Sequence, residues 1–289
     1  MATYSGSCTL TTPTTIDSKV INCSPLVIDT GSAGTIIKNS YLHGAVVQTN
    51  GGDGSTDAFT IQDSILDNGV SYPACTSGPY VGAACPAGIY GCGDPNNATT
   101  DCGIGYHNFT ILRTEVKNTI RGAYCISGAT IQDSYFHDSK HWPDASNLAH
   151  GSGFRNQQNC TFTHNSVFCD FGRNDGFDPA TINGDIGCSA DMSGYPQDTT
   201  IDHDTITFNL FGDNNVGVSY CIYAGSTPAA HTGDPGNAEF LRFEDNVFKK
   251  GPNGMCGGAY HVTDYVTGKT GSTWLRNKFD DGTTAPPDG

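Results

Sequence analysis

The chain contains 289 residues, with 14 basic and 29 acidic side chains and a formal net charge of −15. A protein this acidic repels nucleic acids and anionic membrane surfaces, because both bind proteins through basic patches. No stretch approaches the ~18 consecutive apolar residues of a membrane-spanning helix. We therefore expect no nucleic-acid partner and no membrane insertion, and the spaced Ile, Val and Phe runs exclude a disordered chain.

Residues 1–34 are expected to form an N-terminal cap. Val20–Cys23 and Leu26–Asp29 each have the length and the β-branched content of a short strand. A disulfide between Cys8 and Cys23 would hold this end of the fold. A stacked fold needs such a cap, because its first coil otherwise exposes its core and its strand edges.

A six-residue pattern then recurs: an apolar residue, any residue, Asn or Asp, a small polar residue, any residue and another apolar residue. Clear copies are Ile37–Leu42, Ile61–Leu66, Ile131–Phe136 and Phe243–Phe248. Weaker copies are Ile111–Val116, with Arg113 in the Asn/Asp position, Thr163–Phe168, which begins with a polar residue, and a decayed copy near His203–Ile206. Repeats at intervals of roughly 20–50 residues indicate a solenoid whose stacked units share one core. No long stretch carries a helical period, so helix should be minor.

Polar insertions separate these repeats. The longest, residues 70–108, contains four of the twelve cysteines and is expected to leave one coil as a disulfide-rich loop, not as a second domain. Further insertions cover residues 139–159, 170–200 and 212–238. Residues 270–289 should form the last coil and a tail.

The twelve cysteines predict disulfides and hence a secreted or cell-surface protein. Zinc is the competing interpretation, but no Cys-x-x-Cys motif occurs and no Cys/His cluster has finger spacing. Spacing alone does not fix the connectivity. The expected pairs are Cys8–Cys23, Cys75–Cys85, Cys92–Cys102, Cys125–Cys160, Cys169–Cys188 and Cys221–Cys256.

Several segments resemble a known family. They are Cys8–Pro13, the repeats themselves, Tyr220–Gly225, Gly254–Gly257 and Trp274 with Asp280–Gly282. Together they resemble the secreted right-handed parallel β-helix proteins of actinobacteria and some of their phages, which are related in fold to pectate lyases. The resemblance covers nearly the whole chain and implies an all-β, single-domain right-handed parallel β-helix over residues 1–289. It implies no particular catalytic residue.

A first candidate site follows from the residues that leave the repeats. Asp138, Asp170 and Asp213 occupy comparable positions after three successive repeats, so neighbouring coils would bring them to roughly 5 Å per coil. Carboxyl groups ~5–10 Å apart can act as acid and base, or as acid and nucleophile, in glycoside hydrolysis. The alternative is that an Asp near a turn only caps backbone N–H groups.

A second candidate lies between Cys169 and Cys188. Asp175 is a candidate catalytic acid there, Arg173 a candidate substrate ligand, and Asp175 and Asp178 are weak candidates for a Ca²⁺ site, since oxygen-rich loops suit this ion. The spacing does not match an EF-hand loop, and the sequence requires no cofactor. A plain solvated loop is the alternative.

The insertion at 139–159 offers groups for a different reaction. Polysaccharide lyases abstract a proton next to a uronate carboxyl group with a Lys, Arg or His base. Candidates for that chemistry are Lys140, His141 and Arg155, with His150, Trp142 and Tyr223 as substrate-binding residues. Trp142 could instead pack its own loop onto the helix.

These observations favour a secreted polysaccharide-cleaving enzyme that holds an extended glycan along one groove. The surplus of acids slightly favours a glycoside hydrolase, with Asp170 and either Asp138 or Asp175 as the pair, over a lyase that acts by β-elimination. A non-catalytic glycan-binding, adhesive or structural surface module is the remaining alternative, and it would use aromatic residues such as Tyr195 and Tyr223. Convergence of the acids with Lys140, His141 and Arg155 in one groove would favour the enzyme.

Overall fold

The computed structural model describes residues 1–49, 57–69, 102–139, 151–170, 188–194, 196, 199–212, 220–225, 238–251, 253–257, 260–263, 265 and 267–287. In this part of the chain all regular elements are β-strands, which form three sheets named here A, B and C. No helix long and apolar enough to cross a membrane occurs among these residues.

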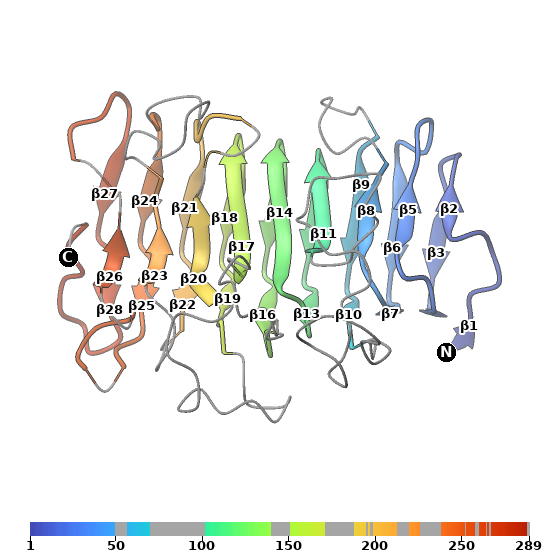
Figure 1. Ribbon diagram of the computed structural model, residues 1–289, viewed down its shortest axis with the longest axis horizontal. Coiled ribbons are helices and arrows are strands. Elements are labelled where there is room, and N and C mark those ends of the chain that lie inside the picture. The colour runs from blue at the N-terminus through green and yellow to red at the C-terminus, as the bar shows by residue number, and fades with distance from the viewer. Residues whose placement is uncertain are drawn as a thin grey trace, which may run out of the picture.

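The three sheets run along the whole length of the molecule, and their strands stack side by side (Figure 1). Sheet A contains β1 (Ala2–Thr3), β4 (Lys19–Ile21), β7 (Tyr41–His43), β10 (Ile65–Asp67), β13 (Glu115–Lys117), β16 (Tyr135–His137), β19 (Ser166–Val167), β22 (Leu210–Phe211), β25 (Val247–Phe248) and β28 (Lys278–Phe279). Sheet B contains β2 (Thr9–Leu10), β5 (Leu26–Ile28), β8 (Val46–Gln48), β11 (Cys102–His107), β14 (Arg121–Ser127), β17 (Gly151–Gln158), β20 (Cys188–Gly194), β23 (Tyr220–Tyr223) and β26 (Tyr260–Thr263). Sheet C contains β3 (Thr15–Asp17), β6 (Thr35–Lys38), β9 (Phe59–Gln62), β12 (Phe109–Leu112), β15 (Thr130–Gln132), β18 (Thr161–Thr163), β21 (Thr205–Thr207), β24 (Arg242–Glu244) and β27 (Thr273–Leu275).

The chain visits the sheets in the fixed order A, B, C and then begins the next coil. Each strand pairs in parallel with the strand one coil away, as β13 does with β16, β14 with β17 and β15 with β18. The N- and C-termini therefore lie at opposite ends of the stack (Figure 1). This arrangement is a parallel β-helix, so the predicted fold class is confirmed.

The apolar positions of the repeat form the core. In sheet C, Ile61, Ile111, Ile131 and Phe162 occupy one register column, and all four side chains are fully buried. The Phe162 ring also stacks on Phe154 of sheet B, with 4.4 Å between the centroids. Burial of each such side chain stabilises the fold by ~1.5–3 kcal/mol, and the stack shares this core between neighbouring coils.

The Asn/Asp position of the repeat is a one-residue turn from sheet C to sheet A. The turn residues all have a left-handed backbone, which Asn and Asp adopt more easily than other non-glycine residues. They are Asn39, Asp63, Arg113, Asp133, His164, Phe208, Asp245 and Arg276, with φ between 47° and 58°. The chain makes the same turn at Arg113 and Phe208, although neither residue type favours it.

Two weak copies of the repeat were assigned to the wrong residues. Phe162 pairs with Ile131 and Ile206 pairs with Phe162, so the true copies are Phe162–Val167 and Ile206–Phe211. The predictions at Thr163–Phe168 and near His203–Ile206 are therefore wrong. Asn165 has the residue type expected at the turn, but the turn itself is made by His164.

The small polar position next to the turn forms a ladder of buried side chains. Its last members are Asn165, Asn209, Asn246 and Asn277. Each accepts a hydrogen bond at Oδ1 from the backbone N–H of the preceding ladder residue, at 2.8–3.0 Å. Each Nδ2 donates to a backbone carbonyl of sheet C. This ladder satisfies the polar groups at the tight corner.

Three of the expected disulfides are present: Cys8–Cys23, Cys125–Cys160 and Cys221–Cys256. Cys169 is also disulfide-bonded, while the side chain of its expected partner Cys188 lies outside the described residues. The side chains of Cys75, Cys85, Cys92 and Cys102 lie outside them as well. The disulfides indicate an oxidising environment.

Several sheet B strands begin inside segments that were predicted to be insertions. β11 starts at Cys102, β17 at Gly151, β20 at Cys188 and β23 at Tyr220, so each insertion is shorter than the sequence suggested. The sequences of these strands are polar and contain glycine, so they lack the apolar pattern that predicts a strand. The glycines are needed, because a Cβ on Gly153 would lie 2.3 Å from Cγ1 of Val167 in sheet A.

Candidate functional site

The outer face of sheet A carries a cluster of titratable side chains. Along its strands Leu42, Leu66, Val116 and Phe136 point into the core, so the residues on either side of them point outward. We name one group of side chains the sheet A cluster. It comprises the interacting outward residues of β7, β10, β13 and β16 and two acids that follow β16 and β19. Its members are Tyr41, Asp67, Glu115, Lys117, His137, Asp138 and Asp170.

His137 connects two carboxylates at the centre of this cluster. Its Nε2 lies 2.9 Å from Oε1 of Glu115, and its Nδ1 lies 3.0 Å from Oδ2 of Asp138. Carboxylates only accept hydrogen bonds, so both contacts are complete when both ring nitrogens of His137 carry a proton. The ring also stacks on Tyr135, with 3.9 Å between the centroids and an interplanar angle of 11°. Stacking, the hydrogen bond with Glu115 and the contact with Asp138 fix its orientation.

Glu115 is kept ionised by its neighbours. Burial raises the pKa of this carboxyl, but hydrogen bonds from Lys117 and His137 outweigh that effect and hold the pKa below its usual value. Nζ of Lys117 lies 3.0 Å from Oε1 of Glu115. In turn, the hydrogen bond to Glu115 raises the pKa of Lys117. The pair therefore stays charged through the neutral range.

Asp67 is held in the same way at the N-terminal side of the cluster. It accepts hydrogen bonds from the Tyr41 hydroxyl at 2.7 Å, from Nδ2 of Asn118 at 2.6 Å and from the backbone N–H of Gly69 at 3.0 Å. Burial raises the pKa of Asp67, yet these hydrogen bonds lower it further and the net result is a pKa below the usual value. The same bond to Asp67 raises the pKa of Tyr41.

Asp170 behaves in the opposite way. Burial raises its pKa, and the nearby charge of Asp138 adds to that effect. Backbone hydrogen bonds, including one from the N–H of Ser139 to Oδ1 at 3.4 Å, only partly compensate. Asp170 therefore holds its proton to higher pH than an ordinary Asp, and the charge of Asp138 contributes to this effect.

Of the predicted column of acids, the described residues include Asp138 and Asp170, which follow the neighbouring strands β16 and β19. Asp138 and Asp170 are brought together, but not in the same register, because Phe136 pairs with Val167 and this pairing places Cys169 opposite Asp138. Asp170 instead lies opposite Ser139, whose N–H it accepts. Asp213 lies outside the described residues.

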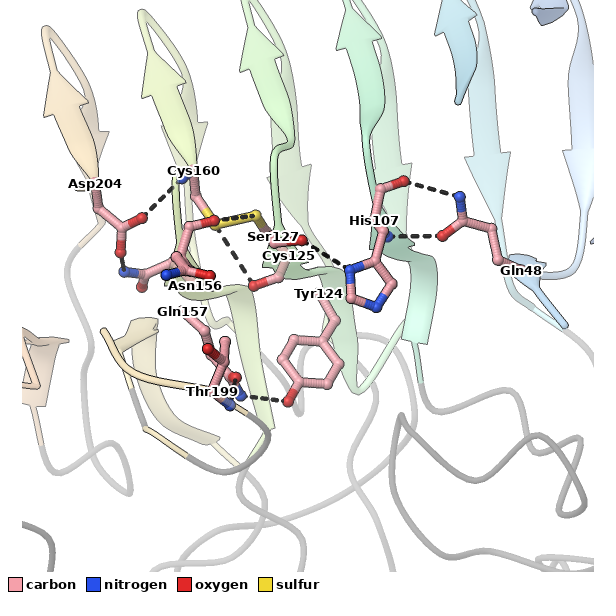
Figure 2. Close-up of a disulfide and its surroundings, with 11 residues drawn as sticks. Gln48, His107, Tyr124, Cys125, Ser127, Asn156, Gln157, Cys160, Thr199 and Asp204 are labelled. Atoms are coloured by element: carbon pink, nitrogen blue, oxygen red, sulfur yellow. Dashed lines mark hydrogen bonds between the residues drawn. A yellow bond between two sulfur atoms is a disulfide. The ribbon is translucent and has the colours of Figure 1, made fainter. Parts of the chain in front are cut away.

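Arg155 and Tyr223 lie elsewhere, on sheet B. They share one register row with Tyr124 and Ser193. Arg155 is 4% exposed, and its guanidinium carbon lies 4.9 Å from the centroid of the fully buried Tyr124 ring. The hydroxyl of Tyr124 accepts a hydrogen bond from Nε2 of Gln157 at 2.5 Å (Figure 2). This row is a packed polar layer on a different sheet from Asp138 and Asp170.

The other predicted site residues lie outside the described residues. They are Lys140, His141, Trp142, His150, Arg173, Asp175 and Asp178. Their roles in catalysis, glycan binding or Ca²⁺ binding stay predictions.

Sequence reasoning missed Tyr41, Asp67, Glu115, Lys117 and His137. Tyr41 and Glu115 precede the second apolar residue of the repeat, where the pattern allows any residue. Asp67, Lys117 and His137 directly follow that apolar residue. Alignment of those unconstrained positions across the repeats would have placed them in two adjacent columns, since side chains alternate along a strand.

No protein-family model matches this chain, and searches of curated proteins and of solved structures return no similar protein. The fold class therefore depends on the order and register of the strands in this chain itself.

Proposed function

We propose that this protein is a secreted polysaccharide-cleaving enzyme, and specifically a glycoside hydrolase that acts at the sheet A cluster. The observation that carries the proposal is the Asp138–Asp170 pair, in which the pKa of Asp170 is raised by burial and by the charge of Asp138. A carboxyl group whose pKa is raised by burial, close to a second carboxyl group, is the usual general acid of glycoside hydrolysis.

In this proposal Asp170 is the general acid. Its proton passes to the glycosidic oxygen while the bond to the leaving sugar breaks. Asp138 remains a carboxylate and acts on the other side of the sugar, either on a water molecule or directly on the anomeric carbon. His137 is a positioning residue, because it holds Oδ2 of Asp138 at 3.0 Å and is itself held by Glu115.

The neighbouring residues would support an extended glycan. The Tyr135 ring is 41% exposed, and it contacts Phe168 edge-on as well as stacking on His137. Aromatic faces of this kind suit the apolar faces of sugar rings. The resemblance to β-helix proteins related to pectate lyases supports the same class of substrate, and the disulfides support secretion. No metal or cofactor is required for this chemistry.

A screen of neutral and uronic-acid glycans tests the proposal. Hydrolysis releases reducing ends without the ultraviolet absorbance of unsaturated products, whereas elimination produces both. Asp170→Asn should abolish the release of reducing ends. Asp133→Asn is the matched control, because Asp133 is a half-buried acid on the same coil, at the opposite end of β16, where it contacts His164. Elimination products would favour a lyase, and binding without cleavage would favour a glycan-binding module; either result contradicts the hydrolase.

A further inference from the structure

A second group of reactive side chains lies inside the helix, away from the sheet A cluster. Asp191 of β20, Cys221 of β23 and Cys256 are all fully buried, and their ligand atoms lie within 4.8 Å of one another. In the structure Cys221 and Cys256 form a disulfide. An acid is rarely buried completely. Oδ1 of Asp191 accepts a hydrogen bond from the backbone N–H of Cys169 at 2.7 Å, whereas Oδ2 faces the disulfide.

The donor atoms around this disulfide have separations typical of a metal site. Sγ of Cys221 lies 3.5 Å from Oδ2 of Asp191 and 3.8 Å from the carbonyl oxygen of Gly212. Sγ of Cys256 lies 2.8 Å from the same carbonyl. In tetrahedral zinc sites, bond lengths of ~2.3 Å to sulfur and ~2.1 Å to oxygen place neighbouring ligand atoms roughly 3.5–3.8 Å apart. Two of the three separations already have that length.

We propose that Asp191, Cys221 and Cys256, with the carbonyl of Gly212, bind a thiophilic divalent cation such as Zn²⁺ when the Cys221–Cys256 disulfide is reduced. The disulfide and the metal are then alternative states of one site. After reduction the two sulfur atoms would lie about 3.7 Å apart in the completed tetrahedron.

The reaction balances in atoms and charge. A phosphine or dithiol reductant supplies two electrons, two protons enter, and the S–S bond becomes two thiols. Binding of one Zn²⁺ then releases two thiol protons. With Asp191 ionised, the oxidised site carries one negative charge; the metal site, with two thiolates, the carboxylate and Zn²⁺, carries the same net charge. The buried charge is unchanged, so the core accommodates either state.

Cys125–Cys160 provides a matched control. It also joins neighbouring coils, has the same sequence separation of 35 residues, and is fully buried. The carboxylate beside it, Asp204, accepts from the backbone N–H of Cys160 at 2.7 Å and from Nδ2 of Asn156 at 2.6 Å (Figure 2). Within the described part of the chain, no group with metal-ligand geometry includes Cys125 or Cys160.

Cobalt binding to the reduced protein tests this site, because Co²⁺ replaces Zn²⁺ and gives an intense band with thiolate ligands. We expect reduced wild type and the Cys125→Ser/Cys160→Ser variant to show this band. Cys221→Ser/Cys256→Ser should lose it, and Asp191→Asn should bind Co²⁺ at least ~10-fold more weakly, since even indirect metal contacts contribute that much. An unchanged band in Cys221→Ser/Cys256→Ser, or unchanged affinity in Asp191→Asn, would overturn the proposal.

A measurement on the wild type avoids variants that fail to fold. The reduced chain is treated with an alkylating reagent with and without Zn²⁺, and each cysteine is quantified by mass spectrometry. Zn²⁺ should protect Cys221 and Cys256 and leave the alkylation of Cys125 and Cys160 unchanged. Equal protection of both pairs, or protection of neither, would overturn the proposal.

Discussion

Two corners of the same helix differ in what they do. The corner between sheets C and A is crossed by a single residue in each repeat, and a ladder of buried Ser, Thr and Asn side chains supports it. At the other end of the sheet A strands the chain leaves the repeat, and carboxyl groups, His137 and aromatic rings gather there. The residues of the first corner stabilise the fold, whereas those of the second corner are available for the proposed catalysis.

The acids of the two regions show this difference. At the turns, hydrogen bonds from Arg113 and Arg276 lower the pKa values of Asp63 and Asp245 respectively. Past the end of β19, burial and a like charge raise the pKa of Asp170. Ion pairs thus lower the pKa of the Asp side chains at the turns, whereas burial raises the pKa of Asp170 at the other corner.

The largest effect is expected from Asp170→Asn. Loss of a general acid typically reduces kcat by ~10²–10⁴-fold, and the fold should remain intact because Asp170 lies outside the core. Activity should be present below the raised pKa of Asp170 and fall as the pH rises through it. Kinetics on a cleaved glycan check this, with circular dichroism as the folding control. Asp133→Asn should behave like wild type; equal losses in the two variants would contradict the division between the corners.

The next effect is on stability, at the ladder. Asn209→Ala removes the acceptor for the Asn165 N–H and leaves the carbonyl of Phe162 without the Asn209 donor. Each buried polar group left unsatisfied costs ~1–3 kcal/mol, so we expect a loss of about 2–4 kcal/mol in the free energy of unfolding. Denaturant unfolding measures it. Thr130→Ala, on the outer face of sheet C, should change stability by less than ~1 kcal/mol. Similar losses for both variants would mean that the ladder has no special role.

His137→Gln should have a smaller, purely catalytic effect. The variant breaks the connection between Glu115 and Asp138 and should lower kcat by ~10-fold, as loss of a positioning partner typically does, with little change in KM. His164→Gln is the control, since His164 contacts Asp133 at the turn. A change in KM alone would assign His137 to substrate binding instead.

The smallest effect is expected from Arg113→Ala. Arg113 donates two hydrogen bonds to Asp63, at 2.6 and 2.9 Å, but both groups are exposed and screened by solvent. Because the folded-state pKa of Asp63 is lowered, this stabilisation is present above the unfolded pKa and is lost as the pH falls through the folded value. The thermal midpoint should therefore drop slightly at neutral pH and not at all in strong acid. A drop larger than that of Asn209→Ala would contradict the account of this corner.

The fold could be predicted because each repeat contains both the inward apolar residues and the turn residue. Ile131–Phe136 contains the inward residues, the left-handed Asp133 and the ladder residue Ser134 in six positions. The sheet B strands escaped prediction, since Gly151–Gln158 is polar and glycine-rich where it packs tightly against sheet A. Proximity of Asp138 and Asp170 could be predicted, but their register could not, because it depends on how the chain leaves β16 and β19.

Burial and the charge of Asp138 raise the pKa of Asp170 past the end of β19, and the proposed general acid depends on this shift. Carboxyl-carbon NMR titration of Asp170, Asp138 and Asp133 in the free protein measures this directly and requires no substrate. The account predicts that Asp170 titrates above the usual range for Asp and well above Asp133, and that Asp138→Asn lowers the pKa of Asp170. An Asp170 that titrates at or below Asp133 would contradict it.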